Sequence, residues 1–95
     1  MFQNPKYLTC GAQRTLPAWL VILLWHLIDR IPDTNRDYLQ VFRLMRTDTG
    51  QHIIHSQEQP SYRYEMDIPC KDALNAKIFV MDDQTHSTML LAEEC

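Results

Sequence analysis

The longest apolar stretch of the chain lies between residues 16 and 28, and its apolar positions recur with the period of a helix. Thr15 stands just before Leu16 and Pro17, and Thr followed by Pro in the first turn is a common helix start. Pro32 and the polar residues after it predict that the helix ends near Arg30. The side of this helix expected to face the core carries Leu16, Leu20, Leu23, Leu24, Leu27 and Ile31.

The opposite side of the same helix is also apolar, since it carries Val21, Ile22 and Trp25. A helix that is apolar nearly all round is buried on two sides. In a chain of 95 residues another protein chain can cover the second side, so the pattern allows a homodimer through this helix. We therefore expect Trp25 to lie at an interface.

Beyond the helix the apolar period changes to two, which is typical of strands. Residues 37–46 and 51–57 flank the turn Thr47-Asp48-Thr49-Gly50 and predict a hairpin. Residues 61–68 alternate between apolar and charged side chains, as expected of a strand with one face in water. Further strands are predicted at residues 7–10, 76–81 and 87–93.

Short loops join most of these strands, and such connections favour an antiparallel meander with the helix on one face. The sequence therefore predicts an α+β fold in which one main helix packs on an antiparallel sheet of about five strands. The length fits one domain that covers residues 1–95.

Composition narrows the classes of function. The net charge is −3 and the Lys and Arg residues are scattered, so we expect no direct DNA binding. The three cysteines are widely spaced and form no C-x-x-C pair, which indicates reduced thiols and a cytoplasmic location. The first residues contain no apolar signal core, and the stretch 16–28 is shorter than the roughly 20 residues that span a bilayer, so no membrane association is expected.

The histidines are the residues best suited to chemistry. His52 and His55 are three apart on a predicted strand, so their side chains are expected on opposite faces, where they cannot share a metal. His55 and His86 would form a metal site only if they met across the sheet with Glu58 or Asp82 as a third ligand. Otherwise they are surface or hydrogen-bonded histidines.

Other catalytic patterns are weak. No serine or cysteine has the local context of a nucleophile, and two distant glycines cannot form a phosphate-binding loop. The acidic pairs Asp82-Asp83 and Glu93-Glu94 are expected to serve a turn and a solvated chain end. No cofactor is expected, and an enzymatic activity is less favoured than binding.

Aromatic residues are frequent for a chain of this size: Tyr38, Tyr62, Tyr64, Trp19 and Trp25. Tyr and Trp are favoured at interfaces because they bury a large area at small entropic cost. Trp19 and Tyr64 fit the core of the helix–sheet sandwich equally well.

Residues 37–42, 53–60 and 79–94 resemble a small bacterial family of Firmicutes called domain of unknown function 960. The likeness covers nearly the whole chain and includes Met1, Phe2 and Tyr7. Cys95 departs from the aromatic ending typical of that family, so no family role carries over to it. The resemblance implies no reaction, but it does imply carriage on mobile elements, whose small proteins often neutralise host defence. An anti-CRISPR inhibitor of a type II RNA-guided nuclease is the concrete form that this context implies.

We therefore expect a non-enzymatic protein-binding module, with the CRISPR nuclease or its guide-RNA complex as partner in the specific form. Two alternatives remain: a small metal-dependent enzyme, such as a nuclease acting on guide RNA, that uses clustered His and Asp, and a housekeeping homo-oligomer. The residues expected to bind the partner are Trp25, Glu58, Gln59, Tyr62, Arg63 and Glu65.

Overall fold

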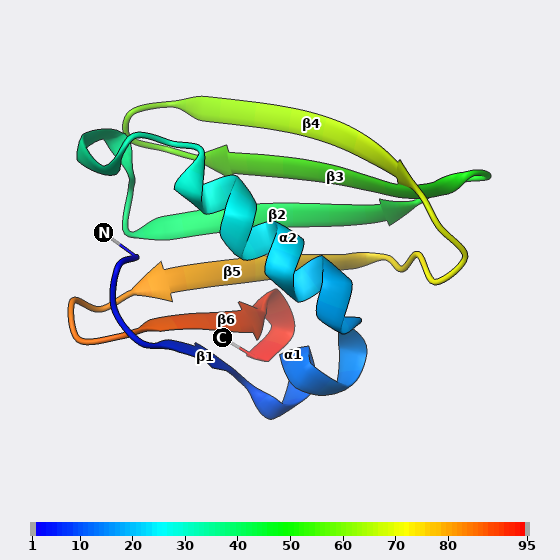
Figure 1. Cartoon of the computed structure of the whole chain (residues 1–95), viewed down its shortest axis with the longest axis horizontal. Helices are drawn as coiled ribbons and strands as arrows, with labels where there is room; N and C mark the ends of the chain where they lie inside the picture. The colour runs from blue at the N-terminus through cyan, green and yellow to red at the C-terminus, as the bar shows by residue number, and fades with distance from the viewer. Residues whose placement is uncertain (1, 95) are drawn as a thin grey trace.

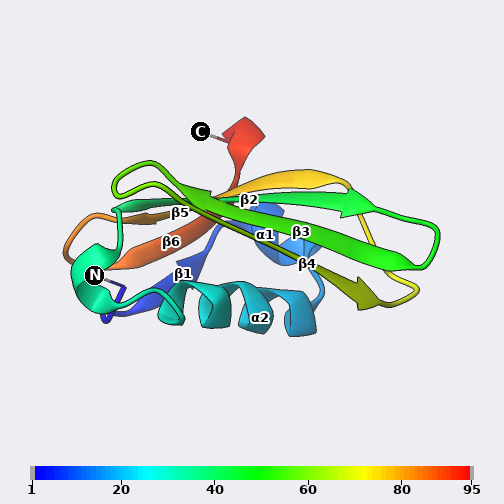
Figure 2. The same cartoon turned by 90° about the horizontal axis from the view of Figure 1, so that it is seen from above.

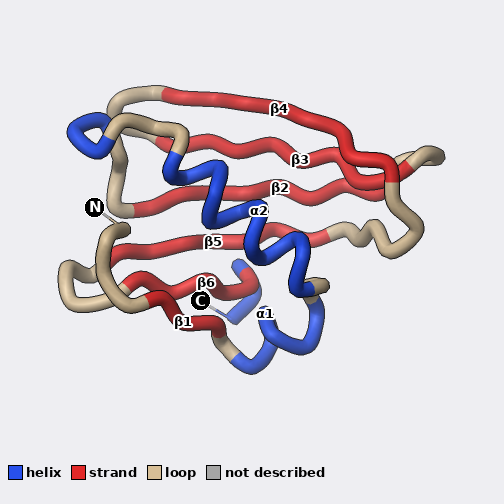
Figure 3. The backbone as a smooth tube through the Cα atoms, in the orientation of Figure 1, coloured by secondary structure: helices blue, strands red, loops and turns tan. Residues whose placement is uncertain are grey.

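Residues 2 to 94 are described by the computed structural model of the chain; Met1 and Cys95 lie outside them. They form a six-stranded mixed sheet with two α-helices (Figure 1, Figure 3). The elements are β1 (Lys6–Leu8), α1 (Cys10–Thr15), α2 (Ala18–Asp29), η1 (Asp33–Asn35), β2 (Leu39–Arg46), β3 (Gly50–Gln57), β4 (Tyr62–Pro69), β5 (Ala76–Asp82), β6 (Ser87–Leu91) and η2 (Ala92–Glu94), where η marks a short 3-10 helix. The α+β prediction is confirmed, but the sheet has one strand more than expected and is not purely antiparallel.

The strand order is β1-β6-β5-β2-β3-β4, with β1 parallel to β6 and all other neighbours antiparallel. The predicted meander is wrong, because after β4 the chain crosses back past β3 and β2 to reach β5. Buried Gln51 fastens this crossing: its side chain donates to the Leu74 carbonyl at 3.0 Å and accepts from the Leu74 N–H at 2.9 Å. A connection held by a distant side chain leaves no periodic signal in the local sequence.

The core lies between α2 and one face of the sheet (Figure 2). The fully buried side chains that meet there include Leu20, Leu24, Ile28, Phe42, Leu44, Ile53, Ile78 and Met89. Burying an aliphatic or aromatic side chain stabilises the fold by about 1.5–3 kcal/mol, so this layer supplies most of the stability. The predicted core face of the helix is largely confirmed, with Leu23 only half-buried and Ile28 buried in addition. Within residues 2–94, no helix has both the length and the apolar character needed to cross a bilayer.

The strand predicted over residues 7–10 is present as β1, but it ends at Leu8, and the segment from Cys10 onward is helical. Thr9 caps α1 by accepting the Ala12 N–H at 3.2 Å. Glu94 comes from the other end of the chain and accepts the Thr9 hydroxyl at 2.6 Å, so it is not the solvated tail that the sequence suggested. A Cβ at Gly11 would approach this carboxylate to 2.6 Å, so a side chain there would displace the end of Glu94.

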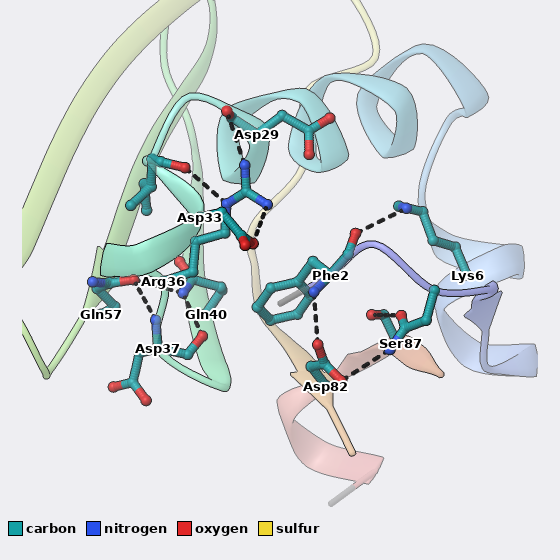
Figure 4. A network of polar contacts seen from close by, with 12 residues as sticks. Phe2, Lys6, Asp29, Asp33, Arg36, Asp37, Gln40, Gln57, Asp82 and Ser87 are labelled. Carbon is teal, nitrogen blue, oxygen red and sulfur yellow. Dashed lines mark hydrogen bonds and ion pairs between the residues drawn. The ribbon is translucent and has the colours of Figure 1, made fainter. Parts of the chain in front are cut away.

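The end of α2 falls at Asp29, as the proline and polar cluster predict. Arg36 reaches back and donates to the carbonyls of Ile31 at 2.8 Å and Asp29 at 3.2 Å (Figure 4). The Asp29 carbonyl has no partner inside the helix, and a cation beside the C-terminal end of the helix is also stabilised by the helix dipole.

Phe2 is buried in the core, and its amide donates to Asp82 at 2.6 Å (Figure 4). Asn4 donates to the other oxygen of Asp82 at 3.0 Å. Burial opposes ionisation of Asp82, but the hydrogen bonds from Phe2 and Gln84 outweigh it and place its pKa below the usual value. Asp82 therefore anchors the N-terminal segment and is more than a turn residue.

Candidate functional site

In the two-layer arrangement of residues 2–94, one face of the sheet has no α-helix over it. α2 lies on one side, whereas η2 rises from the end of β6 on the other (Figure 2). We call this second face the open face. By alternation along the paired strands, its side chains are Leu39, Val41, Arg43, Met45, His52, Ile54, Ser56, Arg63, Glu65, Asp67, Lys77, Phe79, Met81, Thr88 and Leu90. Every one of them is at least partly exposed.

Two like charges stand opposite each other near the centre of the open face. Arg43 of β2 is the register partner of Lys77 of β5, and both side chains are exposed. Like charges directly opposite in a sheet are destabilising by about 0.2–1 kcal/mol. Among residues 2–94 the structure records no ion pair for either side chain. This uncompensated pair is where an external anion would be most stabilising.

A shallow depression of about 360 Å³ surrounds this pair. Its lining consists of Val41, Arg43, Ile54, Ser56, Arg63 and Lys77. Three cations, one hydroxyl and two aliphatic side chains therefore line it, with no carboxylate. Such a lining suits a ligand that is both anionic and partly apolar, because guanidinium groups pair with carboxylates while the aliphatic floor excludes water.

Apolar side chains continue from the depression toward β6. Phe79 stands opposite Val41 on one neighbouring strand and opposite Leu90 on the other. The Lys77 ammonium lies 5.5 Å from the centroid of the Phe79 ring, a cation–π contact. A half-buried apolar strip bordered by charged side chains resembles the apolar core and polar rim of a protein interface.

An acidic corner closes the open face on the β4 side. His52 lies 2.8 Å from Asp67 and 3.1 Å from Glu65. Its hydrogen bond to Asp67, helped by that to Glu65, raises the pKa of His52 above the ordinary value. Arg63 donates to Glu65 at 3.1 Å, and together with His52 it lowers the pKa of Glu65. These carboxylates are paired with His52 and Arg63, whereas the structure records no carboxylate partner for Arg43 or Lys77 among residues 2–94.

The histidines do not assemble a catalytic site in the described part of the chain. His55 is fully buried, stacks on Phe42 and contacts Gln40 through Nε2 at 2.7 Å, while its Nδ1 has no partner. Burial lowers the pKa of His55 to about 4. His86 lies elsewhere, beside Asp83 and Thr85.

The structure records no contact between His55 and His86, and residues 2–94 contain no group of three His, Cys, Asp or Glu placed to hold a metal. His52 lies on the open face and His55 on the covered face, so the prediction that they point to opposite sides is confirmed.

Comparisons with known proteins identify relatives but no activity. The family model described as "Staphylococcal protein of unknown function (DUF960)" matches residues 5–94. The chain belongs to this DUF960 family. A solved structure described as a protein of unknown function from Enterococcus faecalis is similar, with a TM-score of 0.79 and 27% identity over 97% of this chain and 91% of that chain. No curated protein matches.

In this DUF960 chain, the residues expected to bind a partner do not form one surface. Arg63 and Glu65 lie on the open face, but Tyr62 lies on the opposite face with its ring 5.4 Å from that of His55. Glu58 and Gln59 are exposed in the loop between β3 and β4, and Gln59 donates its N–H to Asp37 at 3.1 Å.

Trp25 is also less exposed, and so less accessible to a partner, than its position on the helix suggested. It is half-buried and packs against the core, with the Lys6 ammonium 5.6 Å from its ring centroid. The expected solvent-facing side of the helix is represented mainly by Ile22, which is 66% exposed.

The sequence analysis did not identify Arg43 and Lys77, the central cations of the open face. Both stand in strands that are mostly apolar, where a charged residue usually marks a solvated position. Their significance appears only when β2 and β5 are known to be neighbours with this register. The sequence signal for this pair was a cation in each of two mostly apolar strands that are far apart along the chain.

Proposed function

We propose that this protein is a non-enzymatic protein-binding module that holds an acidic segment of its partner on the open face. The observation that carries the proposal is the opposition of Arg43 and Lys77, for which the described part of the chain shows no compensating anion. A partner carboxylate between them replaces a repulsion with two charge-assisted hydrogen bonds. The binding surface is rigid, because both cations stand on paired strands of a central sheet.

A polypeptide fits this face better than a nucleic acid does. The chain carries a net charge of −3, which repels a polyanion at long range. Glu65 and Asp67 form an acidic corner beside the depression, where a continuous phosphate backbone would be repelled. Val41, Phe79 and Leu90 offer instead an apolar strip for the side chains that flank an acidic residue in a protein segment.

The general proposal is tested with a defined probe: a fluorescent peptide in which Glu alternates with Val. We expect it to bind the wild-type protein with an affinity that falls with salt, and to bind weakly to an Arg43→Ala/Lys77→Ala variant, in a fluorescence anisotropy titration. Arg14→Ala/Lys71→Ala is the matched control, because it removes the same charge from exposed positions away from the open face. Equal binding by both double variants would contradict the proposal.

The narrower form of the proposal is an anti-CRISPR inhibitor of a type II RNA-guided nuclease. It is supported by the association of the family with mobile elements, which the resemblance implies, and by the small, rigid and mildly acidic character of the chain. The inhibitor would bind the nuclease or its guide-loaded form and block assembly or access of DNA.

A DNA-cleavage assay tests this form with purified nuclease, guide RNA and EDTA-washed inhibitor. We expect loss of cleavage with the wild-type protein and recovery of cleavage with the Arg43→Ala/Lys77→Ala variant. Unchanged cleavage together with normal binding of the acidic peptide would reject the anti-CRISPR form and leave the binding module in place.

A further inference from the structure

The strand β4 forms one edge of the sheet, and no further strand of residues 2–94 pairs with its outer side (Figure 1). It pairs with β3 along its whole length in an unbroken register, from Gly50 opposite Pro69 to Gln57 opposite Tyr62. An edge of this length without a bulge or an internal proline is a template for another strand, unless it is protected. The other edge, β1, has only three residues.

The backbone groups that face outward from β4 follow from the phase of the hydrogen-bond ladder. In the turn before β3, the Thr47 N–H donates to the Gly50 carbonyl at 2.9 Å, so this pair is a hydrogen-bonded one. Such pairs alternate along an antiparallel ladder, so the even-numbered residues of β3 bond to β2 and the odd-numbered ones to β4. The odd-numbered residues of β3 face the even-numbered residues of β4. Arg63, Glu65 and Asp67 therefore direct their N–H and C=O groups away from the sheet.

The side chains of β4 on the helix side are also incompletely covered. Tyr62, Tyr64, Met66 and Ile68 are all half-buried, whereas the β3 residues opposite them are buried. A second strand beside β4 would cover this row and satisfy the outward backbone groups together.

We propose that two copies of this chain pair through their β4 edges, antiparallel, about a two-fold axis at Tyr64. This register places Arg63 of each copy opposite Glu65 of the second copy, and Tyr62 opposite Met66 of the second copy. The backbone N–H and C=O groups of Arg63 and Glu65 both point outward, toward the second copy. Each Arg63–Glu65 pair across the junction is therefore a backbone hydrogen-bonded pair. A register centred on Glu65 would instead place two glutamates face to face.

The pairing makes one continuous sheet, with both α2 helices on one side and both open faces on the other. Arg63 lines the depression on each open face, so the two depressions lie on either side of the new junction. The inference stands on the β4 edge alone and does not require that the open face bind an acidic segment.

Two charge-reversal variants test the register. In Arg63→Glu each junction pair becomes two glutamates, and in Glu65→Arg it becomes two arginines, so each variant alone is expected to dissociate at least about tenfold more readily than the wild type. When the two variants are mixed, every junction pair is again Glu opposite Arg. The mixture is therefore expected to recover the dimer. Within each chain of the mixture, positions 63 and 65 still carry like charges. A restored contact inside one chain therefore cannot explain the recovery of the dimer.

Sedimentation velocity of the full chain gives the readout, with circular dichroism to show that each variant is folded. The expected result is a wild-type mass of twice 11.3 kDa at high micromolar concentration, lighter single variants and a restored dimer on mixing. The Arg63→Glu/Glu65→Arg double variant should dimerise on its own. A monomeric wild type, or a dimer that neither single variant weakens, would overturn the proposal. The second of these outcomes would point to a dimer through the exposed side of α2.

Discussion

The two faces of this sheet are built from alternate residues of the same strands, but they differ in how their polar and charged side chains are paired. On the covered face most buried polar groups are paired, His55 Nδ1 excepted: Gln40 donates to Gln57 at 2.7 Å, and Gln57 donates to the Pro60 carbonyl at 2.8 Å. On the open face Arg43 and Lys77 stand together with no anion between them in the described chain. The covered face supplies the apolar core, whereas under the proposed function the open face gives up some stability for recognition.

Neighbouring isoleucines of β3 provide the largest and cleanest contrast. Ile53 is fully buried against α2, whereas Ile54 lies on the open face. We expect Ile53→Ala to lower the free energy of unfolding by about 2–5 kcal/mol, and Ile54→Ala by less than about 1 kcal/mol. Urea denaturation of both variants measures the difference, and equal losses would mean that the open face is covered in solution.

The two β3 histidines are expected to respond to pH in opposite directions. His55 has a folded pKa of about 4 against 6.5 for a free histidine, so its unfolded form binds more protons between these values. Its stability contribution is present above pH 6.5 and is lost as pH falls toward 4, by about 3 kcal/mol at most.

His52 has a raised folded pKa, so its contribution is present below pH 6.5 and is lost as pH rises through the folded value. An NMR titration of the two imidazole rings measures both pKa values. A pKa for His55 at or above that of His52 would contradict this assignment of faces.

Loss of the Gln51 side chain is expected to have an intermediate effect. Gln51→Ala removes the hydrogen bonds to both backbone groups of Leu74 and leaves these groups without that partner. We expect a loss of about 1–3 kcal/mol and faster amide hydrogen exchange in the loop from β4 to β5. Unchanged exchange there would show that the crossing does not depend on this residue.

The substitution with the smallest expected effect on the free energy of unfolding is expected to raise it. Arg43→Thr removes the like-charge opposition to Lys77 and introduces a residue favoured in strands. The free energy of unfolding should rise by about 0.2–1 kcal/mol while binding of the acidic peptide weakens. A destabilised variant would mean that Arg43 already has a compensating partner.

The predictable parts of this molecule are those whose signal is local. The alternation of Tyr62, Arg63 and Tyr64 gave β4 and its two faces, and the apolar repeat gave α2. The helix α1 was missed because its six residues are too few to show a periodic pattern, and Thr15, expected at the start of the long helix, is the last residue of α1. The charged centre of the open face was missed because its signal is not local, since Arg43 meets Lys77 only through the crossing of the chain.

Methyl NMR of Ile53 and Ile54 during titration with the Glu–Val peptide tests the central claim most directly. The two methyl groups belong to adjacent residues but report on opposite faces, and Ile54 lines the depression. If the open face binds the acidic segment, the Ile54 methyl signal should shift progressively while that of Ile53 stays in place. Saturable binding that shifts Ile53 and leaves Ile54 unchanged would contradict the account.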